Sequence, residues 1–162
     1  YIKNSGHPFI ASIYDGTRRG VLADWTTSDE VKNYENGTLG GFDNYGNGGF
    51  MSMERYSSPQ ILNGKIYQSF DLPSGKYEMT AAFLDFSVKE QAFIMAAVGS
   101  SLPDIANADQ VLGAAPFTNP KIEFFLAEPQ RITIGVVAYF MEDQQYFRLD
   151  KFRLYHYKGL WD

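Results

Sequence analysis

The residues best suited to chemistry lie in and just after the glycine-rich segment 40–49. Four of them stand at relative positions 1, 5, 6 and 12 of a calcium-binding loop, namely Asp43, Asn47, Gly48 and Glu54. Position 3 is Tyr45, which forfeits one oxygen ligand, and no helical pattern flanks the segment. The segment also lacks a Gly-Lys-Ser/Thr ending and leads into a strand pattern, which argues against a phosphate-binding loop. We therefore expect a turn here rather than a calcium or phosphate site.

Catalytic motifs are scarce in the rest of the chain. The sequence has no cysteine and only two histidines, His7 and His156, which excludes disulfides, thiolate metal sites, cysteine nucleophiles and a three-histidine zinc site. No Gly-x-Ser-x-Gly motif indicates a serine nucleophile. Glu54 is the best candidate for a catalytic acid, but no local motif supplies the second carboxylate that a glycosidase needs. We therefore expect a protein that is not an enzyme.

Several aromatic residues lie beside polar, turn-forming residues instead of in alternating apolar runs: Trp25, Tyr34, Tyr45 and Trp161. An exposed ring next to amides and carboxylates suits sugar binding, because the ring stacks on the apolar face of the sugar and the polar groups bond its hydroxyls. The candidate ligand-binding residues are Trp25, Asp43, Asn44, Tyr45 and Asn47. For Trp25 the alternative is a plug at the end of the fold. Trp161 has two interpretations, an anchor for the C-terminus or a contact with a neighbouring domain.

Composition limits the partners of the chain. The net charge is −5 and lysines and arginines do not cluster, so nucleic acid is not an expected partner. No apolar stretch approaches the ~18 residues of a transmembrane helix, and no basic-then-apolar signal segment opens the chain. Because the chain starts at Tyr1 rather than Met, we expect a mature or excised fragment.

Strand patterns dominate the elements that must position these residues. Residues 66–70 and 76–83 alternate and are joined by the turn sequence 72–75, which predicts a β-hairpin. Asn63-Gly64 predicts a tight turn that lets residues 50–56 pair nearby. Residues 91–98 and 121–127 are further strand candidates. Residues 132–140 are apolar on both faces, as in a central strand covered on both sides.

The last strand, 146–157, contains a change of phase. Phe147 and Leu149 share one parity whereas Phe152 and Leu154 share the other, so we expect either a one-residue bulge near Asp150-Lys151 or two separate strands that bend there. Residues 103–110 form the one short helical pattern. Many short strands separated by Gly and Pro predict an all-β protein, an antiparallel β-sandwich at residues 17–162, preceded by an N-terminal arm or inter-domain linker at residues 1–16.

The sequence also resembles a known family. The motifs that carry the resemblance are, in chain order, RGVLADW (19–25), GGFD (40–43), NGKIYQ (63–68), LPSGKY (72–77), GSSLPD (99–104), IGV (134–136) and FRLDKFRLY (147–155). Over about residues 17–157 the chain is similar to C-terminal domains of unknown function in Bacteroidetes surface lipoproteins, which have a galactose-binding-domain-like jelly-roll fold.

The resemblance implies a non-catalytic β-sandwich carried on a larger lipoprotein at the cell surface or outer membrane. Such domains are often suspected of binding glycans through loops at one end of the sandwich, here the 40–49 loop and the surroundings of Trp25. Relatives with this fold often hold a structural calcium near the last strand, and Asp150 is the matching position. The lipid-anchoring cysteine and the preceding domain of such proteins are absent here, which is consistent with an excised C-terminal piece.

We therefore expect a glycan-binding accessory module. Its partners would be a polysaccharide or oligosaccharide and other domains of the same lipoprotein, with membrane contact only through a lipid anchor outside this chain. The alternative is a structural or protein-interaction domain without glycan binding. A third hypothesis is an enzyme with Glu54 as an acid. A concave surface lined by Tyr45 or a Trp, with Asn and Asp beside it, favours glycans, a flat apolar patch favours a protein partner, and a deep cleft with two carboxylates favours the enzyme.

Overall fold

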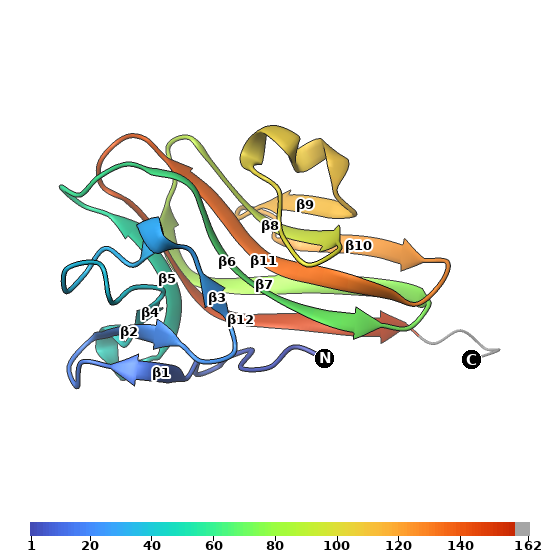
Figure 1. Ribbon diagram of the computed structural model, residues 1–162, viewed down its shortest axis with the longest axis horizontal. Coiled ribbons are helices and arrows are strands. Elements are labelled where there is room, and N and C mark those ends of the chain that lie inside the picture. The colour runs from blue at the N-terminus through green and yellow to red at the C-terminus, as the bar shows by residue number, and fades with distance from the viewer. Residues whose placement is uncertain (158–162) are drawn as a thin grey trace.

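Two antiparallel β-sheets face each other in a computed structural model that describes residues 1–157 (Figure 1). The seven-stranded sheet, sheet A, has the order β1 (Ala11–Tyr14), β2 (Arg19–Leu22), β4 (Phe42–Asp43), β5 (Phe50–Arg55), β12 (Gln145–Tyr157), β7 (Gly75–Ser87) and β10 (Lys121–Leu126). The five-stranded sheet, sheet B, has the order β3 (Thr26–Thr27), β6 (Ile61–Leu72), β11 (Gln130–Phe140), β8 (Gln91–Val98) and β9 (Gly113–Pro116). The predicted β-sandwich is confirmed, and the finer assignment to a jelly roll stays a prediction.

Three short 3-10 helices connect the strands: η1 (Asp29–Val31), η2 (Tyr45–Asn47) and η3 (Ile105–Gln110). The helical pattern predicted for residues 103–110 corresponds to η3, which lies over the outer face of sheet B. None of the helices within residues 1–157 has the length and apolar character needed to cross a membrane.

The main core lies between the two sheets and explains the alternating patterns. In β6, Ile66 is fully buried between the outward-facing Lys65 and Tyr67, and in β7 Tyr77 and Met79 face the same core. β11 lies between β6 and β8 and is buried on both faces, because η3 and its flanking loop cover its outer side. The prediction of a central strand at 132–140 is confirmed.

The predicted hairpin between residues 66–70 and 76–83 is wrong. β6 belongs to sheet B and pairs with β11 and β3, whereas β7 belongs to sheet A and pairs with β12 and β10. The turn at Pro73 and Ser74 therefore carries the chain from one sheet to the other. Pro and Gly suit both kinds of connection, since they set the local turn and not the direction in which the next strand leaves.

The tight turn predicted at Asn63-Gly64 is also wrong, because both residues lie inside β6. The register with β11 shifts at this point, and Asn63 has a φ of 62°, as in a β-bulge. The Asn63 side chain accepts a hydrogen bond of 2.7 Å from the backbone N–H of Ile105. The strand at Phe50–Arg55 pairs with β4 and β12 rather than with β6.

The phase change in β12 is a bulge. Leu149 pairs with Phe83 and Lys151 pairs with Ala82, which leaves Asp150 without a partner in the ladder. On either side of it Phe147 and Phe152 are both fully buried. Of the two alternatives, the bulge within one strand is confirmed.

Residues 1–16, expected to be an arm or linker, contribute to the sandwich itself. β1 pairs with β2 at the edge of sheet A, and Phe9 is buried in the core. Earlier in the segment, Gly6 forms a bridge with Lys151 next to the bulge of β12. The sequence pattern missed this because β1 is mostly exposed, and because the rest of the segment is attached by single residues such as Phe9 without an apolar alternation.

Candidate functional site

Asp43, one of the predicted ligand-binding residues, is at the centre of a buried charge cluster. Its side chain is completely buried and accepts hydrogen bonds from Arg18 at 2.8 and 3.1 Å and from Arg19 at 3.3 Å. The Nε atom of Arg148 approaches the same carboxylate at 3.6 Å. The bond to Asp43 raises the pKa of the Arg18 guanidinium. These contacts occupy the Asp43 carboxylate and give it a structural role.

Glu54, the candidate catalytic acid, belongs to the same cluster. Its carboxylate lies 3.1 Å from Nη2 of Arg19 and accepts a hydrogen bond from the Tyr34 hydroxyl. Burial and this bond to a carboxylate raise the pKa of Tyr34 well above its usual range, so the phenol stays protonated. Arg148 continues the cluster, because its Nη1 donates to Asp85 at 2.9 Å. The side chain of Glu54 is thus buried among Arg18, Arg19 and Arg148.

The structure brings Asn44 and Tyr45 to the edge of this cluster. The Tyr45 ring is exposed on one side but stacks on the guanidinium of Arg148, which lies 4.1 Å from the ring centre. Asn44 donates a hydrogen bond of 2.9 Å to the hydroxyl of Tyr14. Asn47 ends η2 with a φ of 60° and is exposed, as expected for a turn. Asp43, Asn44 and Tyr45 therefore form a loop cluster whose ring is already stacked on a cation.

Trp25 is apart from that cluster, inside the core. It is 6% exposed, its Nε1 donates to the carbonyl of Asn4 at 2.8 Å, and its ring stacks on Phe152 with 5.4 Å between ring centres. The alternative, a plug of the sandwich, is therefore confirmed for Trp25. Trp161 lies outside the described residues.

Asp150, the position expected to hold calcium, has its Oδ1 atom 2.5 Å from Nδ1 of His7. Within residues 1–157 no group of three or more His, Asp or Glu side chains is arranged to hold a metal ion. Calcium takes six to eight oxygen ligands, among which carboxylates supply most of the charge. The described side chains around Asp150 do not fit such a site.

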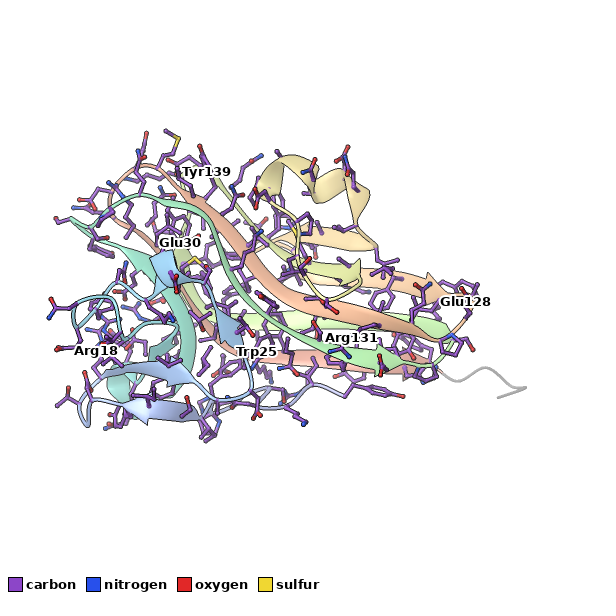
Figure 2. The ribbon with its side chains drawn as sticks, viewed as in Figure 1. Arg18, Trp25, Glu30, Glu128, Arg131 and Tyr139 are labelled. Carbon is purple, nitrogen blue, oxygen red and sulfur yellow. The ribbon has the colours of Figure 1, made fainter. Side chains whose placement is uncertain are left out.

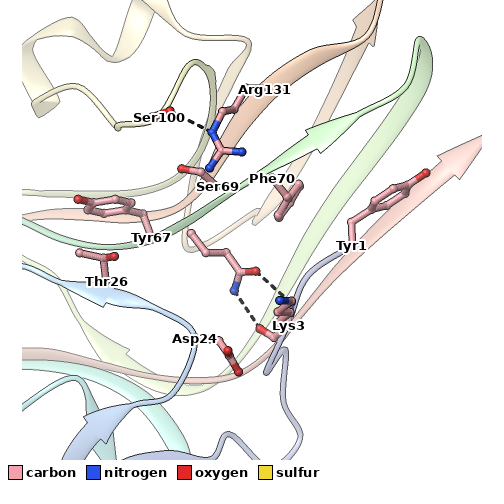
Figure 3. A pocket seen from close by; sticks show the side chains of 10 residues that line it. Tyr1, Lys3, Asp24, Thr26, Tyr67, Ser69, Phe70, Ser100 and Arg131 are labelled. Carbon is pink, nitrogen blue, oxygen red and sulfur yellow. Dashed lines mark hydrogen bonds between the residues drawn. The ribbon is translucent and has the colours of Figure 1, made fainter.

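A groove on the other side of the molecule combines aromatic rings with polar side chains, but neither Tyr45 nor a tryptophan is among its lining residues. It has a volume of about 530 Å³ and is lined by Tyr1, Lys3, Asp24, Thr26, Tyr67, Gln68, Ser69, Phe70, Ser100 and Arg131 (Figure 3). Figure 2 shows Arg18 of the charge cluster at one end of the molecule and Arg131 of the groove nearer the other end. The groove and the loop cluster are therefore separate sites.

Strands β6 and β11 form the base of the groove. Tyr67 and Ser69 stand on the outward parity of β6, opposite Gly135 and Thr133 of β11. The Ser69 and Thr133 hydroxyls are 2.6 Å apart, and Thr133 also donates to the carbonyl of Gly99 at 2.7 Å. Gly135 has no side chain, and its backbone packs closely against Ile66 and Tyr67 of β6.

The N-terminal segment forms one wall of the groove. The backbone N–H of Lys3 donates to Oε1 of Gln68 at 3.0 Å, and Nε2 of Gln68 donates back to the carbonyl of Lys3 at 2.9 Å. The side-chain amide thus holds the segment at the edge of β6 in the place of a backbone ladder. The next residue in the segment, Asn4, is held by its own side chain, because its Nδ2 donates hydrogen bonds to the carbonyls of Ile10 and Ala23.

The opposite wall comes from β11 and from the loop that follows β8. The backbone N–H of Gly99 donates to the carbonyl of Arg131 at 2.8 Å, and Gly99 has a φ of 105°, which favours glycine. The next residue, Ser100, accepts a hydrogen bond of 3.1 Å from Nε of Arg131. The loop therefore fixes the guanidinium at the rim, across the opening from Lys3 and Asp24 in Figure 3.

The groove presents both apolar and polar groups to solvent. Rings of Tyr1, Tyr67 and Phe70 offer apolar faces, and hydroxyl, carboxylate, ammonium and guanidinium groups stand between and beside them. This is the combination of apolar contact and directed hydrogen bonds that small polar ligands require. Sequence reasoning missed the groove except for its neighbour Trp25. The available signal was Tyr67 and Ser69 on the outward parity of β6, with the polar Gln68 between them on the inward parity.

Comparison with protein-family models gives a match. A family model described as "Domain of unknown function (DUF5013)" matches residues 3–135, which include most of the groove and the loop cluster. No curated protein matches the chain.

Proposed function

We propose that this chain, which belongs to the DUF5013 family of domains of unknown function, is a non-catalytic carbohydrate-binding module. We further propose that it is an accessory domain of a lipoprotein at the cell surface or outer membrane, as the resemblance to Bacteroidetes surface lipoproteins implies. The observation that carries the proposal is the open groove in which aromatic rings alternate with polar side chains.

Tyr67 is the ring that best supports sugar stacking. It stands on the outward face of β6, is partly exposed, and has Thr26 and Ser69 beside it in the groove. A sugar ring presents an axial C–H face to an aromatic ring, and its hydroxyls need donors and acceptors at the rim of that contact. Asp24 and Ser100 supply both kinds of group from the two walls.

The groove is also held in place before any ligand arrives. Gln68, Asn4 and the Gly99 carbonyl anchor the two walls to the strands by hydrogen bonds within the fold. A pre-organised site loses little conformational entropy on binding, which favours recognition of a flexible oligosaccharide. Other domains of the same lipoprotein would then hold the module near the polysaccharide.

The test is binding of the purified domain to a polysaccharide and oligosaccharide array, repeated with three variants. We expect Tyr67→Ala to weaken binding about tenfold or more, since the stacking contact is lost. Tyr155→Ala removes a tyrosine that is more exposed than Tyr67 and lies on β12, outside the groove, and it serves as the control. Tyr45→Ala tests the loop cluster, and a loss of glycan binding confined to that variant would show that the binding site is the loop cluster and not the groove. Absence of binding to any glycan would contradict the proposed function.

A structural or protein-interaction domain is the second candidate, and exposed apolar residues at both edges of sheet A favour it. Phe125 of β10 is 68% exposed and Ile13 of β1 is 58% exposed. Edge strands with exposed apolar side chains are places where other chains can pair. A domain of this class would bind no glycan, so the array separates the two candidates.

A further inference from the structure

We infer that the groove prefers acidic glycans, with an anionic group of the sugar, a carboxylate or a sulfate ester, held by Arg131. This inference rests on the proposed function and names the class of glycan. It starts from the charge of the groove walls.

The side chains that line the groove include two cations, Lys3 and Arg131, and one anion, Asp24. The whole chain has a net charge of −5, so this excess of positive charge is local. The two cations come from opposite walls, Lys3 from the N-terminal segment and Arg131 from β11 (Figure 3). A ligand in the groove lies between them.

Arg131 is positioned for an anion by its own hydrogen bonds. Its Nε donates to Ser100 at 3.1 Å, which fixes the plane of the guanidinium. Among the described residues, hydrogen bonds engage Nε and Nη1, and none engages Nη2. A guanidinium with a free Nη at an open rim matches the geometry of carboxylate and sulfate oxygens.

Asp71 does not neutralise this site. Its carboxylate lies 3.4 Å from Nη1 of Arg131, but the two side chains are 83% and 50% exposed. Exposed ion pairs of this kind contribute little free energy and exchange readily with solvent or ligand. The carboxylate of Asp24 is on the opposite wall, where it can accept hydrogen bonds from sugar hydroxyls next to the anionic group.

The experiment compares two pairs of polysaccharides that differ in charge on the same backbone. One pair is polygalacturonate and its methyl ester, and the other is dextran sulfate and dextran. We expect the acidic member of at least one pair to bind about tenfold tighter than its neutral counterpart, with the preference decreasing as salt rises. The pair that shows the preference identifies the carboxylate or the sulfate as the recognised group.

Variants assign the preference to the groove. Arg131→Gln should reduce the affinity for the acidic polymer about tenfold and leave the affinity for neutral glycans unchanged, because one charge-assisted contact is lost. Lys3→Gln should reduce it less, since a flexible ammonium makes no fixed fork. Lys121→Gln removes an exposed lysine from β10 and is the control for bulk charge. Arg131→Lys should restore part of the binding.

Two outcomes would overturn the inference in different ways. Equal affinity for the acidic and neutral members, or an unchanged preference in both Arg131→Gln and Lys3→Gln, would refute acidic specificity in the groove while the carbohydrate-binding function stands. Failure of the domain to bind any polysaccharide, acidic or neutral, on the array would refute the proposed function itself.

Discussion

At the scale of single residues, the buried carboxylate of Asp43 links three arginines from different parts of the chain. Arg18 directly precedes β2, Arg19 is the first residue of β2, and Arg148 comes from β12. A buried charge is tolerated only when partners of opposite charge surround it. The cluster therefore ties the glycine-rich loop to sheet A.

Replacing Asp43 with asparagine should destabilise the fold by about 3 kcal/mol, because the partly buried guanidinium groups of Arg19 and Arg148 would lose their common counter-ion. Chemical denaturation of the purified variant measures the change in the free energy of unfolding. Asp29→Asn alters a fully exposed carboxylate and should change it by less than about 0.5 kcal/mol. An Asp43→Asn protein as stable as the wild type would show that the cluster contributes no net stability.

A second prediction concerns Asp15 in the turn between β1 and β2. Its Oδ1 accepts hydrogen bonds from the backbone N–H groups of Thr17 and Arg18, both at 2.8 Å. These bonds, the one from Thr17 first, lower the pKa of Asp15 from 3.8 to about 2. The ionised form is favoured in the folded state, so its contribution to stability is present above about pH 4 and is lost as the pH falls through about 2.

An NMR titration of the side-chain carboxyl carbons should therefore give Asp15 a midpoint near 2. The difference in unfolding free energy between wild type and Asp15→Asn should be present at pH 6 and vanish towards pH 2. A titration midpoint near the ordinary value of 3.8 would contradict the hydrogen bonds of this turn.

At the scale of elements, side-chain alternation predicted where most long strands lie but not which strands pair. The alternation of 76–83 fixes a buried face at Tyr77 and Met79, and the structure confirms that face. The turn before it contains Pro73 and Gly75, which fit a hairpin and a crossing between sheets equally well. Pairing depends on long-range contacts, so the register of β6 with β11 could not be predicted from either segment alone.

Gly135 in β11 is packed closely against the neighbouring strand β6. A Cβ atom at Gly135 would meet the carbonyl oxygen of Ile66 in the neighbouring strand at 2.0 Å, and a backbone oxygen in the middle of a sheet cannot move aside. Gly135→Ala should therefore cost about 3 kcal/mol or more, or prevent folding. Thermal and chemical denaturation measure the effect.

The matched control is Gly16→Ala in the turn between β1 and β2. A Cβ atom there would meet no atom within 4 Å, and only its φ of 87° is unfavourable for alanine. We expect a cost of about 1 to 2 kcal/mol for that backbone conformation. Equal stability losses in the two variants would show that the close approach of β11 to β6 is not the cause.

At the scale of the whole molecule, the groove is assembled from segments that are far apart in the sequence. Lys3, Asp24, Tyr67 and Arg131 share no motif and no spacing, and only the pairing of β6 with β3 and β11 brings them together. The loop cluster was easier to find, because Asp43, Asn44 and Tyr45 are adjacent in the chain. Local composition therefore indicated the loop cluster and gave no sign that arginines would neutralise its carboxylate.

The stability of the whole domain tests whether residues 1–16 are part of the sandwich. If the segment is part of the sandwich, a protein that starts at residue 10 loses the buried ring of Phe9 and the bond from Trp25 to Asn4, and should be destabilised by at least about 3 kcal/mol. Its affinity for glycans should fall as well, because Lys3 and the wall that it anchors are gone. Phe9→Ala keeps that wall and should therefore reduce stability while retaining glycan affinity in the molecules that remain folded. Denaturation and binding measured on the same samples separate these effects, and a shortened protein with unchanged stability would show that the segment is a dispensable arm.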